Sequence, residues 1–230
     1  TAPGQTPVMT FTVMVDGAPY DILANPLNRL RATIAGPNTD FTRYWQTSVQ
    51  GGGAVGTVTA VNATNGQFMY TFDASAAIPA DATGSYTVGL EGRISVGGEN
   101  FAINGPTLAF AVTGAVQARR RVVEGDKCNA CHRDLALHGG GRKNPNYCVE
   151  CHNPTNANDE RWSRLEGETN LIPSADFKVM IHKIHMGEEL SQAYFLGGFP
   201  VANVANPGGN LINFGEVRFP GNIANCETCH

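Results

Sequence analysis

Cys128-Asn129-Ala130-Cys131-His132 begins a pattern that the chain repeats at Cys148-Val149-Glu150-Cys151-His152 and at Cys226-Glu227-Thr228-Cys229-His230. Each segment reads Cys-x-x-Cys-His, the spacing typical of covalent c-type haem attachment. Two thiols three residues apart can bond the two vinyl groups on one edge of a porphyrin, and the next imidazole can then bind the iron. The three segments therefore predict three covalently bound c-type haems. The predicted attachment residues are Cys128, Cys131, Cys148, Cys151, Cys226 and Cys229.

Disulfides and zinc are the other common uses of cysteine pairs. Neighbouring Cys-x-x-Cys thiols would staple almost nothing, so a disulfide framework is not expected. Sixteen residues separate Cys131 from Cys148, which fits the spacing of a zinc ribbon. Zinc does not require a histidine after each pair, however, and would leave Cys226 and Cys229 without partners. Haem is favoured, and a zinc-ribbon-like binding module stays as an alternative.

The histidine count indicates how the irons are ligated. The chain has six histidines, of which three end the attachment motifs as proximal ligands. Three irons need three distal ligands, and three histidines are left. The predicted iron ligands are His132, His152, His230, His138, His182 and His185. Methionine is the competing distal ligand, with Met180 and Met186 close by in the sequence.

Spacing limits how the distal histidines can be shared. Ser174 is a good N-cap for a helix over Ala175–Met186, and Gly187 suits the position just after its end. His182 and His185 would lie one turn apart on neighbouring faces, so we expect them to serve two different haems. His138 follows His132 by six residues, which in a helix is about 240° of rotation, so it should bind another haem. The sequence does not decide which distal ligand serves which iron.

Ligation in turn indicates function. An iron with two histidines has no open position for a substrate, so the three haems are expected to transfer electrons, and the protein is not expected to be an enzyme. All three motifs lie within residues 128–230, which should hold the haems close enough for electrons to hop between them. A haem enzyme, such as a reductase with one open haem site, is the alternative.

Composition narrows the setting. The chain has 230 residues, 42% of them hydrophobic and 16% charged, which is typical of a folded protein with a real core. A net charge of −4 argues against nucleic acid as a partner. No apolar run approaches the roughly 18 residues of a transmembrane segment, and no signal peptide is visible. Seven basic residues lie between Arg119 and Lys143, either as a solvated linker or as partners of haem propionates.

The chain divides by composition into two parts. Residues 1–117 contain no cysteine and no histidine, so we expect a β domain over 1–118 and a triheme cytochrome c domain over 119–230. The β domain should be a Greek-key sandwich or split barrel with a structural or docking role. The second domain should be rich in loops, with few short helices. The expected strands are Val8–Val15, Leu30–Ile34, Tyr44–Val49, Val55–Val61, Phe68–Phe72, Ser85–Leu90, Arg93–Val96 and Leu108–Val112.

Longer stretches around the motifs resemble the OmcA/MtrC family of outer-surface decahaem cytochromes. The likeness rests on Cys128–His132 followed by Leu135-Ala136-Leu137-His138-Gly139-Gly140, on Asp176–Glu188, and on Phe219-Pro220-Gly221 before the last motif. The resemblance implies bis-histidine haems, with His138, His182 and His185 at the distal positions. It also implies export to the outer membrane or cell surface, and electron delivery to metal oxides, electron shuttles or other cytochromes.

This sequence departs from that family in one respect: the family carries ten haems in two modules, and three motifs are present here. The last motif occupies the final five residues, so the environment of His230 is expected to include residues beyond this sequence or another copy of the protein. The second case predicts a head-to-tail cytochrome filament. The loop 153–160 is a weak calcium candidate.

Overall fold

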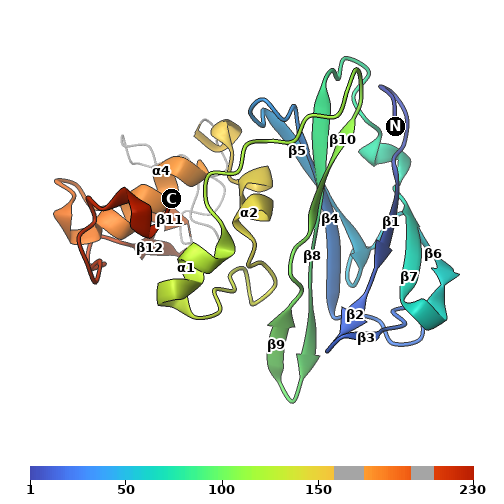
Figure 1. The fold of residues 1–230 in the computed structure, drawn as a ribbon, viewed down its shortest axis with the longest axis horizontal. Coiled ribbons are helices and arrows are strands. Elements are labelled where there is room, and N and C mark those ends of the chain that lie inside the picture. Colours follow the sequence, from blue (N-terminus) through green and yellow to red (C-terminus); the bar gives the residue numbers. More distant parts are fainter. Residues whose placement is uncertain (158–173, 198–209) are drawn as a thin grey trace. The chain divides into compact units, whose positions relative to one another are not determined.

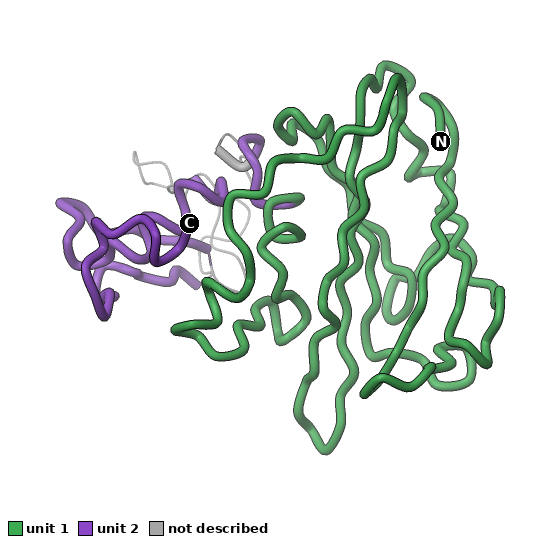
Figure 2. The backbone as a smooth tube through the Cα atoms, in the orientation of Figure 1, with its two compact units in different colours: residues 1–150 green, residues 151–230 purple. Residues whose placement is uncertain are grey.

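A computed structural model describes residues 1–157, 174–197 and 210–230. The chain forms two compact units, Thr1–Glu150 and Cys151–His230 (Figure 2). The division at residues 118 and 119, expected from composition, stays a prediction. Most of the regular structure is β-sheet with few short helices, as the sequence predicts. The loop 153–160 lies partly outside the described residues.

Two antiparallel sheets form most of the β part of the first unit (Figure 1). The smaller has the strand order β1-β7-β6, and the larger has the order β10-β8-β4-β5, with β9 paired to β8. The strands of the smaller sheet are β1 (Val8–Thr12), β7 (Gln67–Thr71) and β6 (Thr57–Asn62). Those of the larger are β4 (Arg29–Gly36), β5 (Arg43–Gln50), β8 (Ser85–Val96), β9 (Glu99–Ala102) and β10 (Thr107–Ala111).

The two sheets share one apolar core. Alternate residues of β4, Leu30 and Ile34 among them, are buried in it together with Phe68 and Tyr70 of β7. Because successive side chains of a strand point to opposite faces, Arg29, Arg31 and Thr33 lie on the other face of β4.

The second face of the larger sheet is covered as well. Glu91 of β8 and Thr33 of β4 are completely buried, although both lie on the face away from the apolar core. The segment that follows the β strands covers them. It includes helices α1 (Gly125–His132) and α2 (Pro145–Cys151). Tyr147 of α2 approaches so closely that a Cβ atom at Gly89 would lie 2.5 Å from its ring.

The strand predictions differ from the structure in three places. The expected strand Val8–Val15 breaks at Val13, whose N–H donates to Gly66 O, and continues as β2 (Met14–Val15), which pairs with β3 (Ala18–Pro19). Two expected strands, 85–90 and 93–96, are one strand, β8. Strand β9 was not expected, because its Glu and Asn residues disfavour strands and only pairing with β8 stabilises it.

The second unit contains helix α4 (Phe177–Met186) and a small hairpin of β11 (Phe195–Gly197) and β12 (Leu211–Asn213). The expected N-cap at Ser174 is wrong. Asp176 caps the helix, because its Oδ1 accepts a hydrogen bond from Lys178 N at 3.3 Å. Ser174 Oγ accepts from Asp176 N, which lies before the first helical residue. Gly187 ends the helix with φ +38°, as predicted.

Candidate functional site

The first attachment motif lies on α1. Cys128 and Cys131 are three residues apart on this helix, so their thiols lie on neighbouring faces one turn apart. The helix ends at His132 because Arg133 adopts φ +61°, a left-handed conformation that stops the α-helical path. Cys128 is half-buried, whereas Cys131 and His132 are exposed.

The second motif lies on and just after α2, which has a buried side and a partly accessible side. Tyr147 and Glu150 lie buried, the tyrosine hydroxyl bonding to Thr33 Oγ1 at 2.7 Å and accepting from Gln46 Nε2 at 2.9 Å. Complete burial raises the pKa of the Glu150 carboxyl well above its ordinary value. The two cysteines of the motif, Cys148 and Cys151, are half-buried, so the packing of α2 leaves both thiols partly accessible.

The third motif begins in a short 3₁₀ helix, η5 (Cys226–Thr228). His230 N donates to Cys226 O at 2.9 Å, so the five residues form one compact turn. Cys226 is exposed and Cys229 half-buried. Across the chain, all six cysteines are thiols with at least partial exposure. Covalent attachment of a bulky group requires such accessibility, so the thiols fit haem attachment.

Three of the six histidines are oriented by backbone carbonyl groups. The Nδ1 atoms of His152, His182 and His185 lie 2.9, 2.5 and 2.8 Å from the carbonyl oxygens of Ala175, Lys178 and Ile181. An imidazole that donates from Nδ1 carries its lone pair on Nε2, the arrangement usual for a metal-binding histidine. In that tautomer, each of these three rings would leave Nε2 open to bind an iron.

Two predicted ligands, one from helix α4 and one from the third motif, lie close together. The rings of His182 and His230 are nearly parallel, at 22°, with centroids 5.9 Å apart. The two imidazoles lie near enough to be candidates for holding the same haem iron. His185, by contrast, lies edge-on to Phe219, with centroids 6.0 Å apart.

His138 occupies a loop, so the helical argument made for it is wrong. Helix α1 ends at His132, and His138 has a positive φ of +54° in a tight turn between Leu137 and Arg142. A rotation of 100° per residue does not apply to such a path. That His138 binds a haem other than the one held by His132 stays a prediction.

The rival ligands find less support in the geometry. Met180 is buried in a small apolar cluster with Ala175 and Tyr194, so it has a packing role. Within the described ranges, no group of three or more His, Cys, Asp and Glu side chains converges as a metal-ion site.

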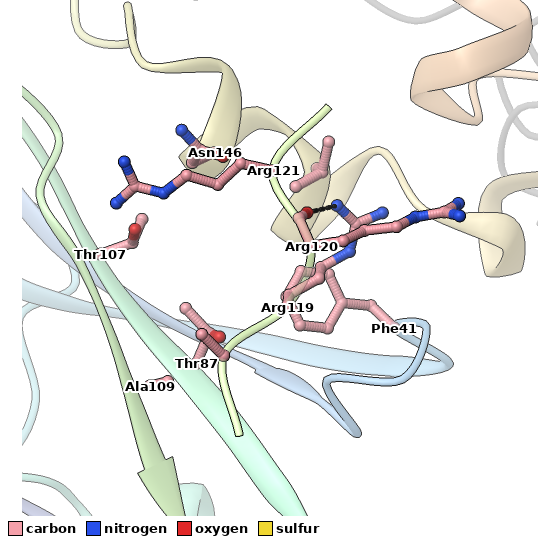
Figure 3. Close-up of a pocket in the computed structure, with 10 residues that line it drawn as sticks. Phe41, Thr87, Thr107, Ala109, Arg119, Arg120, Arg121 and Asn146 are labelled. Atoms are coloured by element: carbon pink, nitrogen blue, oxygen red, sulfur yellow. Dashed lines mark hydrogen bonds between the residues drawn. The ribbon is translucent and has the colours of Figure 1, made fainter. Parts of the chain in front are cut away.

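The basic run beginning at Arg119 lines a cavity of about 90 Å³ in the first unit (Figure 3). Arg119 is held there by Asp40 at 3.7 Å and lies over the ring of Phe41, 5.0 Å from its centroid. Arg121 pairs with Glu124 at 3.5 Å. Arg119 and Arg121 thus have acidic partners within the protein itself. That other basic residues of the run pair with haem propionates stays a prediction.

Comparisons with known proteins find similar cytochromes. Residues 120–230 match the family model described as outer membrane cytochrome MtrC/MtrF-like, domains II/IV. The multiheme cytochrome MtrC of Shewanella baltica (strain OS185) is 29% identical over 161 residues, which cover 65% of this chain and 22% of that protein.

Two solved structures share the fold. The outer membrane decaheme cytochrome OmcA superposes with a TM-score of 0.64 and 19% identity, over 100% of this chain and 38% of that one. MtrC from Shewanella baltica OS185 gives a TM-score of 0.52 and 23% identity, over 81% and 31%. The chain thus spans less than two fifths of the length of each of these proteins.

The attachment motifs and the matched family define the class as multihaem c-type cytochromes. Within that class, residues 120–230 match the MtrC/MtrF-like family model, and the chain is similar to OmcA and MtrC. The motifs and their flanking residues predict this resemblance, and the comparisons confirm it.

Proposed function

We propose that this chain transfers electrons through three covalent c-type haems. Their thiols would come from the three Cys-x-x-Cys pairs, with His132, His152 and His230 as proximal ligands. His138, His182 and His185 would supply the distal ligands. The proximity of His182 and His230 carries the proposal, because a motif histidine and a non-motif histidine lie with their ring centroids 5.9 Å apart.

A c-type haem supplies one-electron chemistry at its iron, and the protein residues decide what else can happen there. Two imidazoles per iron would exclude a substrate from the metal, which favours electron transfer over a haem enzyme. The carbonyl groups of Ala175, Lys178 and Ile181 hold three of the rings by Nδ1, so these ligands need little rearrangement to bind. Rigid ligation keeps the geometry similar in both oxidation states.

The cellular location and the electron-transfer partners are proposed from the similar proteins. The structures that share the fold include an outer membrane cytochrome, and we propose that this chain works at the outer surface of a cell, exchanging electrons with partner cytochromes, metal oxides or electron shuttles. In the described part of the chain, no helix has the length and apolarity to cross a membrane.

The central experiment counts the haems and tests whether each iron is bound by two protein ligands. A pyridine haemochrome assay on the protein matured in a c-type haem-attaching host should find three covalent haems per chain. Reduced protein exposed to carbon monoxide should show no spectral shift, because every iron has two histidines. A carbon monoxide shift in the unmodified protein would favour the reductase alternative, and a chain carrying zinc without haem would overturn the proposal.

A head-to-tail filament, in which the haem chains of successive copies join, is the finest form of the proposal and stays a prediction. Electron cryo-microscopy of the native protein tests it directly. Ordered filaments with continuous haem spacing are the expected result, and monomers alone would contradict the polymer while leaving the electron-transfer role intact.

A further inference from the structure

The loop that carries His138 has an unusual backbone. His138, Gly139 and Gly140 adopt φ values of +54°, +74° and +70°, three left-handed residues in a row. Hydrogen bonds between Leu137 and Arg142 close the loop, with Leu137 N donating to Arg142 O at 2.8 Å. A non-glycine residue in this conformation persists where surrounding structure holds it. The contacts around the loop therefore matter for the position of His138.

Those contacts come from the β strands. Arg29 of β4 donates from Nη2 to the carbonyl oxygen of His138 at 3.2 Å. The carbonyl oxygen of Gly139 accepts from Arg93 Nη1 of β8 and from Asn100 Nδ2 of β9. Three strands of one sheet thus bind two consecutive carbonyl groups of the loop.

A buried carboxylate organises these contacts. The Glu91 side chain is completely buried, and Arg29 donates to its Oε2 from Nη2 at 2.7 Å and from Nε at 3.2 Å. Arg142, at the other end of the loop, reaches Glu91 Oε1 at 3.4 Å. Gly141 approaches so closely that an added Cβ would collide with the Arg29 guanidinium group. Both ends of the loop therefore converge on one carboxylate of β8.

We propose that Arg29, oriented by Glu91, is a positioning residue for His138, and that the β strands thereby set the ligation of one haem. The inference rests on the proposed ligand role of His138. It gives the β half a function beyond that of a spacer. The sheet holds the backbone of His138 in one position, and this limits where the imidazole can lie. A planar guanidinium group suits this role, because it can bind a carboxylate and a carbonyl group at the same time.

The test uses the haem-loaded full chain and its reaction with carbon monoxide, followed by electron paramagnetic resonance of the oxidised form. His138→Ala should open one iron and produce a carbon-monoxide-binding fraction. Arg29→Gln should produce the same high-spin signal at a substantial part of the His138→Ala amplitude. Asn100→Ala, at an exposed position, should give a smaller signal in the same direction and guards against a folding defect in Arg29→Gln.

Two arginine variants serve as controls. Arg43→Gln, on the neighbouring strand β5, removes a bidentate pair with the Asp81 carboxylate, and Arg31→Gln removes a charge 4.0 Å from Glu91 Oε1. The Arg43→Gln and Arg31→Gln variants should both keep all irons low-spin. If His138→Ala opens an iron but Arg29→Gln and Asn100→Ala both fold and stay fully low-spin, the positioning role is overturned and the electron-transfer proposal stands. If His138→Ala itself opens no iron, the ligand assignment of His138 fails, and this inference fails with it.

Discussion

The imidazole rings of His182 and His230 lie nearly parallel with centroids 5.9 Å apart. One ring projects from the middle of helix α4 and the other ends the third attachment motif. From this relationship we propose a pairing that residue spacing leaves open: His182 with the haem of Cys226 and Cys229. We then expect His185, on the neighbouring face of α4, to serve a different haem.

His182→Ala should therefore open the third haem alone. We expect one carbon-monoxide-binding haem per chain in the variant, because removing a distal imidazole vacates one axial position. The same substitution in a Cys226→Ser, Cys229→Ser background, which lacks the third haem, should add no carbon monoxide binding. A full signal in that background would assign His182 to another iron.

Tyr147→Phe should destabilise the contact between α2 and the larger sheet by about 1 kcal/mol, because the Thr33 and Gln46 side chains lose a buried hydrogen-bond partner. Denaturant unfolding followed by circular dichroism measures the change. Tyr20→Phe, at a half-buried position of the β half, is the control and should stay within about 0.5 kcal/mol. Equal effects of the two substitutions would mean that the hydroxyl of Tyr147 contributes nothing specific.

Gly89→Ala should be more damaging. The new methyl group would lie 2.5 Å from the Tyr147 ring and 2.5 Å from Glu150 Oε1, so α2 must move, at a cost of about 1–3 kcal/mol. Gly52→Ala is the matched control, since nothing lies within 4 Å of its added Cβ. Comparing the unfolding midpoints of the two variants checks this, and a midpoint for Gly89→Ala as high as that of the control would show that the contact can relax freely.

Acid should weaken the β half through Asp81. Its hydrogen bond and ion pair with the Arg43 guanidinium group lower the pKa of the Asp81 carboxyl. A lowered pKa means that the pair stabilises the fold above the unfolded-state pKa of about 3.9, and that this contribution is lost as the pH falls through the folded-state value. Arg43→Gln should raise the pKa of Asp81 toward its ordinary value, as measured by carboxyl NMR titration. An unchanged pKa would show that the pair is not formed in solution.

The sequence by itself indicates the chemistry that we propose for this protein. Three Cys-x-x-Cys-His motifs can be recognised without tertiary structure, because a porphyrin edge dictates local residue spacing. Most strands followed from alternating β-branched residues, and the end of α4 from Gly187. The N-cap was misplaced by two residues because Ser174 and Asp176 are both good caps, and only the path of the chain chooses between them.

Tertiary structure decided which residues meet. Glu91 and Arg29 read as ordinary strand charges, yet their burial beneath the loop 138–141 depends on a segment far along the chain. His138 could not be placed by helical periodicity, because a left-handed residue at Arg133 ends the helix first. Likewise, no local pattern brings His182 to His230. Spacing along the chain governs which groups can attach a haem, whereas the pairing of distant ligands depends on packing, which no short motif encodes.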